Sequence, residues 1–345
     1  MGRTTPPRPV DIAALFPEIG PYARTATRLH PRPGAPTAGT SSVGGPLLWP
    51  AAEPWPVCRE PHPRSYGIRP ADARRRREIL AAAWLRPRPA AGGLTYAGDE
   101  EAELDAMTEG PHPPPLPDDA PVPLMALAQL FVRDVPALAE FAPGDTDLLQ
   151  VLWCPFDEHR SIPCAPALRL VWRRAAQVTE VLAGRQPEPE VVEDEGYVPE
   201  PCVLHPEQVT DYPWHEYLPD ALAARIRIWE EGPAQELPGA PSYRADLSLA
   251  PGWKAGGWES WSVTDLQRQY CDDCGRELRL MLTIDSSEWG GANWWPREDP
   301  SPTDPDLPPV PLVGEPTEIA VGRYGAYRVF VCPADASHPH GADVQ

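Results

Sequence analysis

The sequence predicts an α+β fold dominated by antiparallel β-sheet and built from two similar halves. The first observation is a repeated stretch: residues 148–157 and 326–335 both carry an apolar run, then Cys-Pro, then Asp two residues later. The second is a Gly-Gly pair in each half, at Gly44-Gly45 and Gly256-Gly257, followed by a tryptophan and a cysteine. Motifs that recur in the same order indicate an internal duplication, with chance similarity as the alternative. The third is proline, at 50 of 345 residues, which predicts inserted loops and only a few short helices.

The chain begins with an extension over residues 1–43, which is rich in proline and arginine and contains one expected short helix at 10–16. We expect this extension to pack onto the core. The first half-domain follows over 44–185. Its apolar runs, bounded by Gly, Pro or charged residues, predict strands at 124–132, 148–153 and 167–173.

An insertion over 59–122 interrupts the first half. Its first part predicts a helix from Pro70 to about Leu85, and this helix contains four consecutive arginines, 74–77. Beside Glu78, such a run is typical of a solvated helix face. The remainder, over 98–121, is acidic and dense in proline, so we expect it to be loop.

An acidic, proline-rich linker is expected over 186–201, between the halves, and the second half-domain spans 202–345. A loop insertion rich in proline interrupts this half over 292–317. The expected regular elements are a helix with a one-sided apolar stripe over 219–229 and strands over 279–284 and 318–331.

The balance of 30 Lys and Arg against 50 Asp and Glu gives a formal net charge of −20. This charge repels phosphate backbones and anionic membrane surfaces, so we expect cationic partners and neither nucleic acid nor membrane as a ligand. The first residues lack an apolar leader, and the longest apolar stretch, 122–132, is too short to span a bilayer. We therefore expect a cytoplasmic protein whose seven cysteines, an odd number, are reduced.

The sharpest chemical motif is Cys271-Asp-Asp-Cys274-Gly275, because two thiolates three positions apart in a tight turn can share one metal ion. Cys332 and His338 would complete a tetrahedral zinc site, with Asp335 or His340 as alternative fourth ligands. Four protein ligands leave no position for water, so the zinc would be structural. A redox pair and unmetallated burial are the alternatives. The intervening aspartates disfavour the redox pair, because they oppose thiolate formation.

A second, corresponding metal site is possible in the first half. Its candidate ligands are Cys58 and His62, with three residues between them, and Cys154 and His159, with four. Cys164 is a further candidate. Cys202 has no counterpart in the other half, and we expect it to lie in the core.

Segments 44–50, 123–130 and 147–152 resemble the YwqG-like proteins, a largely uncharacterised bacterial family, and the resemblance covers most of residues 44–345. The pairing of 270–275 with 325–332 is similar to the C-terminal domain of the programmed cell death protein 2 group. That resemblance implies paired cysteines that hold zinc and a role as a chaperone for a small-subunit ribosomal protein. The family's last cysteine is absent here, where Asp335 and His338 lie instead.

Three features together favour a non-enzymatic protein-binding module that captures a basic polypeptide in a chaperone-like way: the negative net charge, the family resemblance and the 13 tryptophans. Trp294 and Trp295, in a proline-rich loop, are the candidate partner-binding residues, whereas Trp49, Trp153, Trp258 and Trp261 are expected in the core. A toxin-neutralising interaction protein would have the same composition.

The alternative from another class is a metal-dependent hydrolase. It would use Cys58, His62 and Cys154 plus a water molecule, with Glu158 as the base. The common hydrolase and phosphate-binding motifs are absent from the sequence, so we expect no enzymatic activity.

Overall fold

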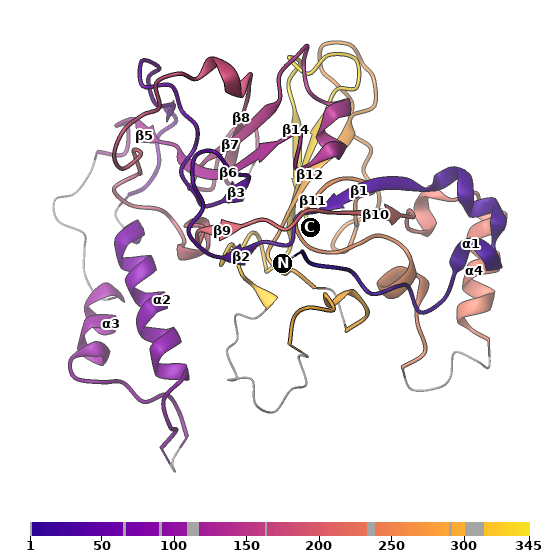
Figure 1. Cartoon of the computed structure of the whole chain (residues 1–345), viewed down its shortest axis with the longest axis horizontal. Coiled ribbons are helices and arrows are strands. Elements are labelled where there is room, and N and C mark those ends of the chain that lie inside the picture. Colours follow the sequence, from indigo (N-terminus) through magenta and orange to yellow (C-terminus); the bar gives the residue numbers. More distant parts are fainter. Residues whose placement is uncertain are drawn as a thin grey trace.

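The computed structural model describes residues 2–64, 67–89, 92–108, 117–162, 164–232, 239–289, 292–300 and 314–345. Within these residues the chain forms two six-stranded antiparallel sheets (Figure 1). The first sheet has the order β2 (Arg32–Pro33), β9 (Cys202–Val203), β3 (Ser42–Val43), β6 (Met125–Phe131), β7 (Leu148–Cys154) and β8 (Ala167–Arg173). The second sheet has the order β10 (Glu207–Asp211), β1 (Arg24–Arg28), β11 (Lys254–Gly256), β12 (Arg279–Asp285), β13 (Ala326–Val331) and β14 (Gly341–Val344).

Short elements surround the sheets. A small ribbon pairs β4 (Val57–Cys58) with β5 (Val122–Pro123). The α-helices are α1 (Ile12–Leu15), α2 (Pro70–Trp84), α3 (Glu100–Thr108) and α4 (Asp220–Glu230). Short segments of 3-10 or π helix occur at η1 (Pro17–Tyr22), η2 (Pro136–Glu140), η3 (Ala175–Gln177), η4 (Glu195–Tyr197), η5 (His215–Tyr217), η7 (Tyr243–Leu247) and η8 (Ala292–Trp294). This is the mixed α+β, mainly antiparallel fold that the sequence predicts. No helix of the described residues is long and apolar enough to cross a bilayer.

The chain crosses between the sheets twice. Strand β1 lies in the second sheet and β2 in the first, whereas β9 lies in the first and β10 in the second. Residues 1–43 are therefore integral to both sheets and are more than an extension packed onto the core. The central strands of the two sheets also resemble each other. In the first sheet β6 pairs with β7 across a bulge at 126–128, and in the second sheet β12 pairs with β13 across a bulge at 280–282.

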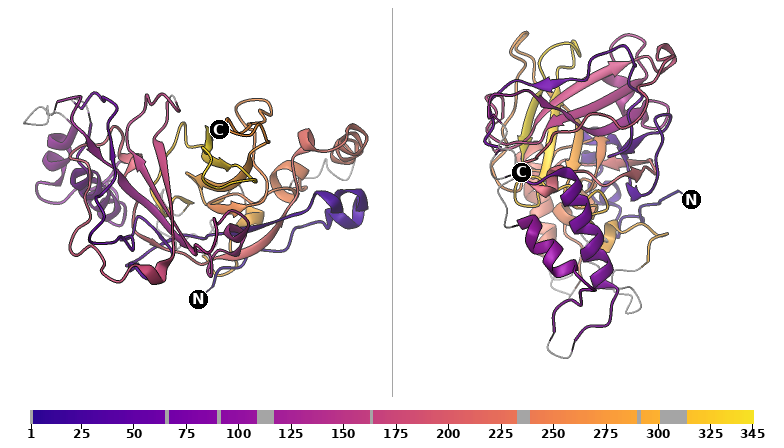
Figure 2. Two further views of the ribbon diagram at one scale, coloured as in Figure 1. Left: turned by 90° about the horizontal axis from the view of Figure 1, so that it is seen from above. Right: turned by 90° about the vertical axis from the view of Figure 1, so that its left-hand side faces the viewer.

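The main core lies between the two sheets and takes side chains from both. Leu127, Val151 and Trp153 of the first sheet join Leu282 and Val329 of the second, all at most 1% exposed. The two sheets thus share the main core, and two smaller hydrophobic clusters lie outside it. Figure 2 shows the sheets inclined to one another, with α2 and α3 beside the first sheet and α1 and α4 beyond the second.

The expected helices at 10–16, 70–85 and 219–229 are confirmed as α1, α2 and α4. Expected strands at 124–132, 148–153, 167–173 and 279–284 are confirmed as β6, β7, β8 and β12. The strand expected over 318–331 forms only from residue 326, and turns precede it. Residues 301–313 of the expected loop insertion 292–317 lie outside the described residues.

The acidic stretch 98–121 is not all loop, because it contains α3. Its first turn carries Glu100, Glu101 and Glu103, which favour a helix N-terminus. Glu100 and Glu103 also form ion pairs with arginines of α2 and its C-terminal end. No proline lies between residues 100 and 108, so the stretch can remain helical.

The arginine run of α2 is not simply a solvated face. The Arg77 side chain is 10% exposed, forms an ion pair with Glu318, and donates hydrogen bonds to the carbonyl oxygens of Glu195 and Val198. The expected linker 186–201 packs here too, because Val192 is fully buried and bridges to Ile68. The apolar residues that lie among the carboxylates of segment 186–201 hold this segment against the rest of the protein.

A buried ion pair joins two strands of the second sheet that flank β1. Lys254 Nζ lies 2.5 Å from Asp211 Oδ2, and both side chains are at most 2% exposed. Asp211 also accepts hydrogen bonds from the backbone N–H groups of Ala250 and Trp258. The carboxylate therefore carries its charge in the interior and depends on Lys254 to balance it.

The substitution Lys254→Met is expected to lower the free energy of unfolding by about 3–5 kcal/mol, because it leaves the Asp211 charge buried and unbalanced. Urea denaturation at pH 7 measures this loss. The matched control is Arg268→Met, which breaks the exposed Arg268–Glu277 pair and should cost less than about 1 kcal/mol. Equal losses in the two variants would contradict the assignment.

Candidate metal centres

The first Cys/His cluster joins a segment that follows β3 to the turn that follows β7. Cys58 ends β4, and His62 lies four residues later, where its backbone N–H donates to the carbonyl oxygen of Asp118. Cys154 is the last residue of β7, and His159 lies in the turn between β7 and β8. The His62 ring stacks on Phe156 with a centroid separation of 4.8 Å. Packing on Phe156 therefore sets the ring orientation of His62.

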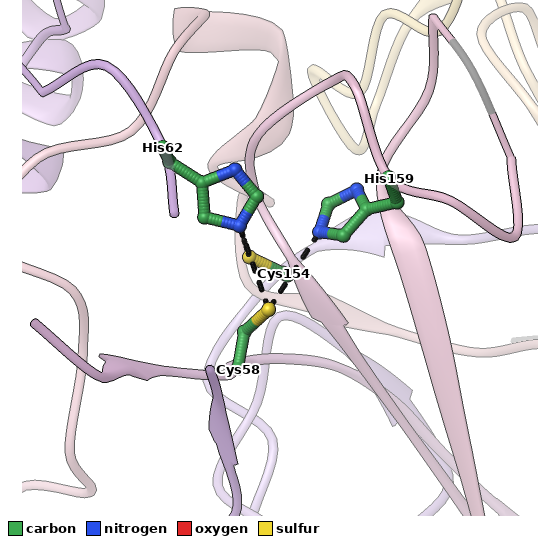
Figure 3. Close-up of side chains that lie close together, drawn as sticks. All are labelled: Cys58, His62, Cys154 and His159. Atoms are coloured by element: carbon green, nitrogen blue, oxygen red, sulfur yellow. Dashed lines mark hydrogen bonds between the residues drawn. The ribbon is translucent and has the colours of Figure 1, made fainter. Parts of the chain in front are cut away.

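The four donor atoms of this first centre converge (Figure 3). His62 Nε2 lies 3.4 Å from both Cys58 Sγ and Cys154 Sγ, and His159 Nε2 lies 3.8 Å from Cys58 Sγ. All four donors lie within 4.8 Å of one another. A tetrahedral zinc ion with ordinary Zn–S and Zn–N bonds has donor-to-donor edges of about 3.3–3.8 Å. The contacts therefore match the edges of such a site.

The first centre is the more deeply buried of the two. Cys154, His62 and His159 are 1–3% exposed, and Cys58 is partly buried. The hydrogen bond with Cys154 holds the pKa of the Cys58 thiol well below its usual range, and the same contact raises the pKa of Cys154. A divalent cation would allow both thiols to ionise.

The second Cys/His cluster occupies the corresponding place in the second sheet. Its Cys271 and Cys274 lie in a turn between β11 and β12, closed by hydrogen bonds from Cys271 N–H to the Arg276 carbonyl and from Gly275 N–H to the Cys271 carbonyl. Gly275 has a φ of +67°, which confirms the positive φ expected for this turn. Cys332 directly follows β13, and His338 lies before β14.

The donors of this second centre also lie within 4.8 Å of one another. Cys271 Sγ is 3.3 Å from His338 Nδ1, and Cys274 Sγ is 3.5 Å from Cys332 Sγ. Burial alone would raise the pKa of the Cys332 thiol. Hydrogen bonds from the backbone N–H groups of Ala334 and Asp335 and the contact with Cys274 outweigh burial and bring this pKa to about 6. The centre lies closer to the surface than the first, because Cys274 is exposed.

All eight predicted ligands thus fall into two clusters among the described residues, each compatible with a tetrahedral metal ion. Asp335 is outside the second cluster, and its Oδ2 lies 3.9 Å from His338 Nε2. His340 is also outside both clusters. Cys164 is exposed and belongs to neither, whereas Cys202 is buried in the core, as expected, and donates to the Pro316 carbonyl.

The prediction that Trp294 is a surface residue is wrong. Its side chain is 3% exposed, and its Nε1 donates to the Ala245 carbonyl at 2.6 Å. Trp295 is partly buried and stacks on Trp289 with a centroid separation of 3.7 Å. The segment folds back onto the second sheet, so its proline content did not indicate exposure. The four tryptophans expected in the core are all buried: Trp49, Trp153, Trp258 and Trp261.

Sequence reasoning missed an acidic cavity of about 330 Å³ between the segments 194–197 and 315–324 and helix α2. Four carboxylates line it, against the single guanidinium of Arg77. Two tyrosines also line it. The only sequence signal for this cavity is a cluster of carboxylates in a proline-rich stretch. The carboxylates and tyrosines of the lining are Asp194, Glu195, Glu315, Glu318, Tyr197 and Tyr324.

Comparison of the sequence with protein-family models and with curated proteins gives no match.

Proposed function

We propose that this chain is a zinc-stabilised, non-enzymatic binding protein that captures a basic polypeptide. The observation that carries the partner assignment is the acidic cavity beside α2, because its carboxylates and aromatic rings suit arginine or lysine side chains. The net charge of −20 supports the same choice through long-range attraction of cations.

Two of the cavity carboxylates already form ion pairs, Glu318 with Arg77 and Glu195 with Arg76, so Glu315 is the carboxylate proposed to receive the cation. Burial raises the pKa of Glu315, and no ion-pair partner of Glu315 occurs among the described residues. Burial also raises the pKa of Glu318, although Arg77 partly offsets the effect. Tyr324 is 69% exposed and offers a ring face at the rim. A bound guanidinium would relieve the cost of keeping these carboxylates charged.

Zinc at both centres is proposed to be structural. In each centre the chain itself offers four donors, so a tetrahedral ion would keep no position for a reacting water molecule. His159 takes the position that the hydrolase alternative reserves for water. This argues for a binding role. The softness of two or three thiolates with imidazole favours zinc over magnesium or calcium.

We also propose that the two sheets derive from a duplication and that the chain is related to the YwqG-like proteins. The duplication is supported by the matched strand positions, the matched bulges and the equivalent places of the two candidate metal centres, and the relation to the family is proposed from the sequence segments alone. His338 would then replace the last cysteine of the programmed cell death protein 2 group.

Substitution Glu315→Lys tests the partner assignment. A fluorescein-labelled peptide of alternating arginine and glycine is expected to bind the native chain and to lose at least about ten-fold in affinity in the variant, because a favourable charge contact becomes repulsive. Fluorescence anisotropy measures the dissociation constant. The matched control Glu231→Lys, at the end of α4, makes the same charge change on an exposed residue away from the cavity and should change affinity less than about two-fold. Equal effects of the two substitutions would refute the cavity as the binding site.

Peptide affinity is expected to fall on acidification. Binding of a cation favours the Glu315 carboxylate, whose pKa burial raises, so binding releases a proton around that pKa. Affinity should therefore rise with pH through that range and level off above it. A titration from pH 4.5 to 7.5 checks the slope, which Glu315→Gln should flatten. An unchanged slope in that variant would count against the assignment.

A further inference from the structure

The two metal centres differ in how easily a small oxidant can reach their sulfur atoms. At the first centre Cys154, His62 and His159 are 1–3% exposed, and Cys58 is partly buried. At the second centre Cys274 is exposed. The donor sets differ as well, because the first centre has two thiols and two imidazoles and the second has three thiols and one imidazole.

The exposed thiol of the second centre lies beside a second thiol. Cys274 Sγ is 3.5 Å from Cys332 Sγ, so a disulfide of about 2.05 Å requires the sulfurs to approach by roughly 1.5 Å. A Cβ placed on the neighbouring Gly275 would have no atom within 4 Å, so no other segment covers this side of the turn. Cys271 is 3% exposed, and its sulfur faces His338.

We propose that Cys274 and Cys332 are a peroxide-oxidisable pair, which makes the second centre a redox-sensitive site. One of the two sulfurs, as the thiolate, attacks one oxygen of hydrogen peroxide, the O–O bond breaks, and the released hydroxide takes that thiol's proton to give water and a sulfenic acid. The other sulfur, as the thiolate, then attacks the sulfenic sulfur, the S–O bond breaks, and the released hydroxide takes the second thiol's proton to give a second water. Two thiols and one peroxide thus give one disulfide and two waters.

Disulfide formation removes two of the four donors of the second centre. Cys271 and His338 remain, and two ligands do not hold a structural zinc ion. The ion is lost, and the link between the 270–277 turn and the end of β13 becomes covalent. The first centre keeps its ion. This loss of zinc rests on the proposed occupancy of both centres, whereas the disulfide itself does not.

Treatment of the full chain with one to five equivalents of hydrogen peroxide tests the proposal. The exposed Cys164 is first replaced by serine, so that its thiol does not consume peroxide. Peptide mapping by mass spectrometry is expected to find a Cys274–Cys332 disulfide, and a zinc-sensitive dye is expected to report release of one of two equivalents. Dithiothreitol with added zinc should restore the starting state.

The proposal is overturned if the mapped disulfide joins Cys58 and Cys154, if Cys274 pairs with Cys271, or if both centres lose zinc at the same rate. A chain that carries no zinc as purified would instead refute the proposed occupancy, and the peptide map would still decide the fate of Cys274 and Cys332. The variant Cys274→Ser should give no disulfide at the second centre, while the peroxide resistance of the first centre should remain as in the parent chain.

Discussion

Removal of metal with a strong zinc chelator is expected to lower the unfolding temperature by about 10 °C or more, because each structural zinc site contributes several kcal/mol to folding. The first centre should account for much of the loss, since its thiol and imidazole groups are buried and would face one another without a shared cation. Differential scanning calorimetry before and after chelation measures the shift. Added Zn²⁺ should restore the original transition, whereas Mg²⁺, which prefers oxygen ligands, should not.

If elemental analysis shows that the treated protein is free of metal and its thermal unfolding transition is unchanged, this expectation is contradicted. The same result with metal retained would show only that the chelator failed to reach the ions, so metal content is measured on the sample that is scanned.

Single-site variants are expected to separate the two centres. Cys271→Ser should remove one zinc equivalent and loosen the second sheet first, because the proposed ion would link the 270–277 turn to the end of β13. Cys154→Ser should remove one equivalent and loosen the first sheet, because an ion at this centre would link β7 to β4 of the small ribbon. Hydrogen exchange with mass spectrometry should report faster exchange in β12 and β13 for the first variant and in β6 and β7 for the second.

The matched control is Cys202→Ser, which alters a buried cysteine outside both clusters and places a hydroxyl beside the Pro316 carbonyl acceptor. It should leave both zinc equivalents in place. Loss of zinc in this control, or identical exchange patterns in the two ligand variants, would refute the assignment of one ion to each sheet.

The candidate ligands could be identified from sequence because their signals are local. Cys271 and Cys274 share one turn, and Cys58 and His62 lie four residues apart. The two ligands of each pair are therefore close to each other even before the chain folds. Cys154 and Cys332 follow apolar strands that end in Cys-Pro. The pairing of β12 with β13 brings Cys332 to the turn of Cys271 and Cys274, and the β4–β5 ribbon, which leads into β6 beside β7, brings Cys58 to Cys154. The sequence alone could not exclude Asp335 as the fourth ligand of the second centre, because only the placement of the side chains distinguishes Asp335 from His338.

Other features depend on contacts between distant segments and have no local signature. Strand β1 pairs Arg24 with Asp211, so residues 1–43 appear in sequence as a proline-rich extension although they join both sheets. Trp294 is buried because Ala245 and Arg28 lie against it, far away in sequence. The acidic cavity arises in the same way, from the packing of residues 194–197 and 315–324 against α2.

Elemental analysis of the purified chain by mass spectrometry tests the central assignment most directly. Protein expressed with zinc in the medium and purified without chelators is predicted to hold two zinc equivalents per chain, and one in each of Cys154→Ser and Cys271→Ser. A folded chain that holds no zinc and takes up none on dialysis against micromolar Zn²⁺ would contradict the account.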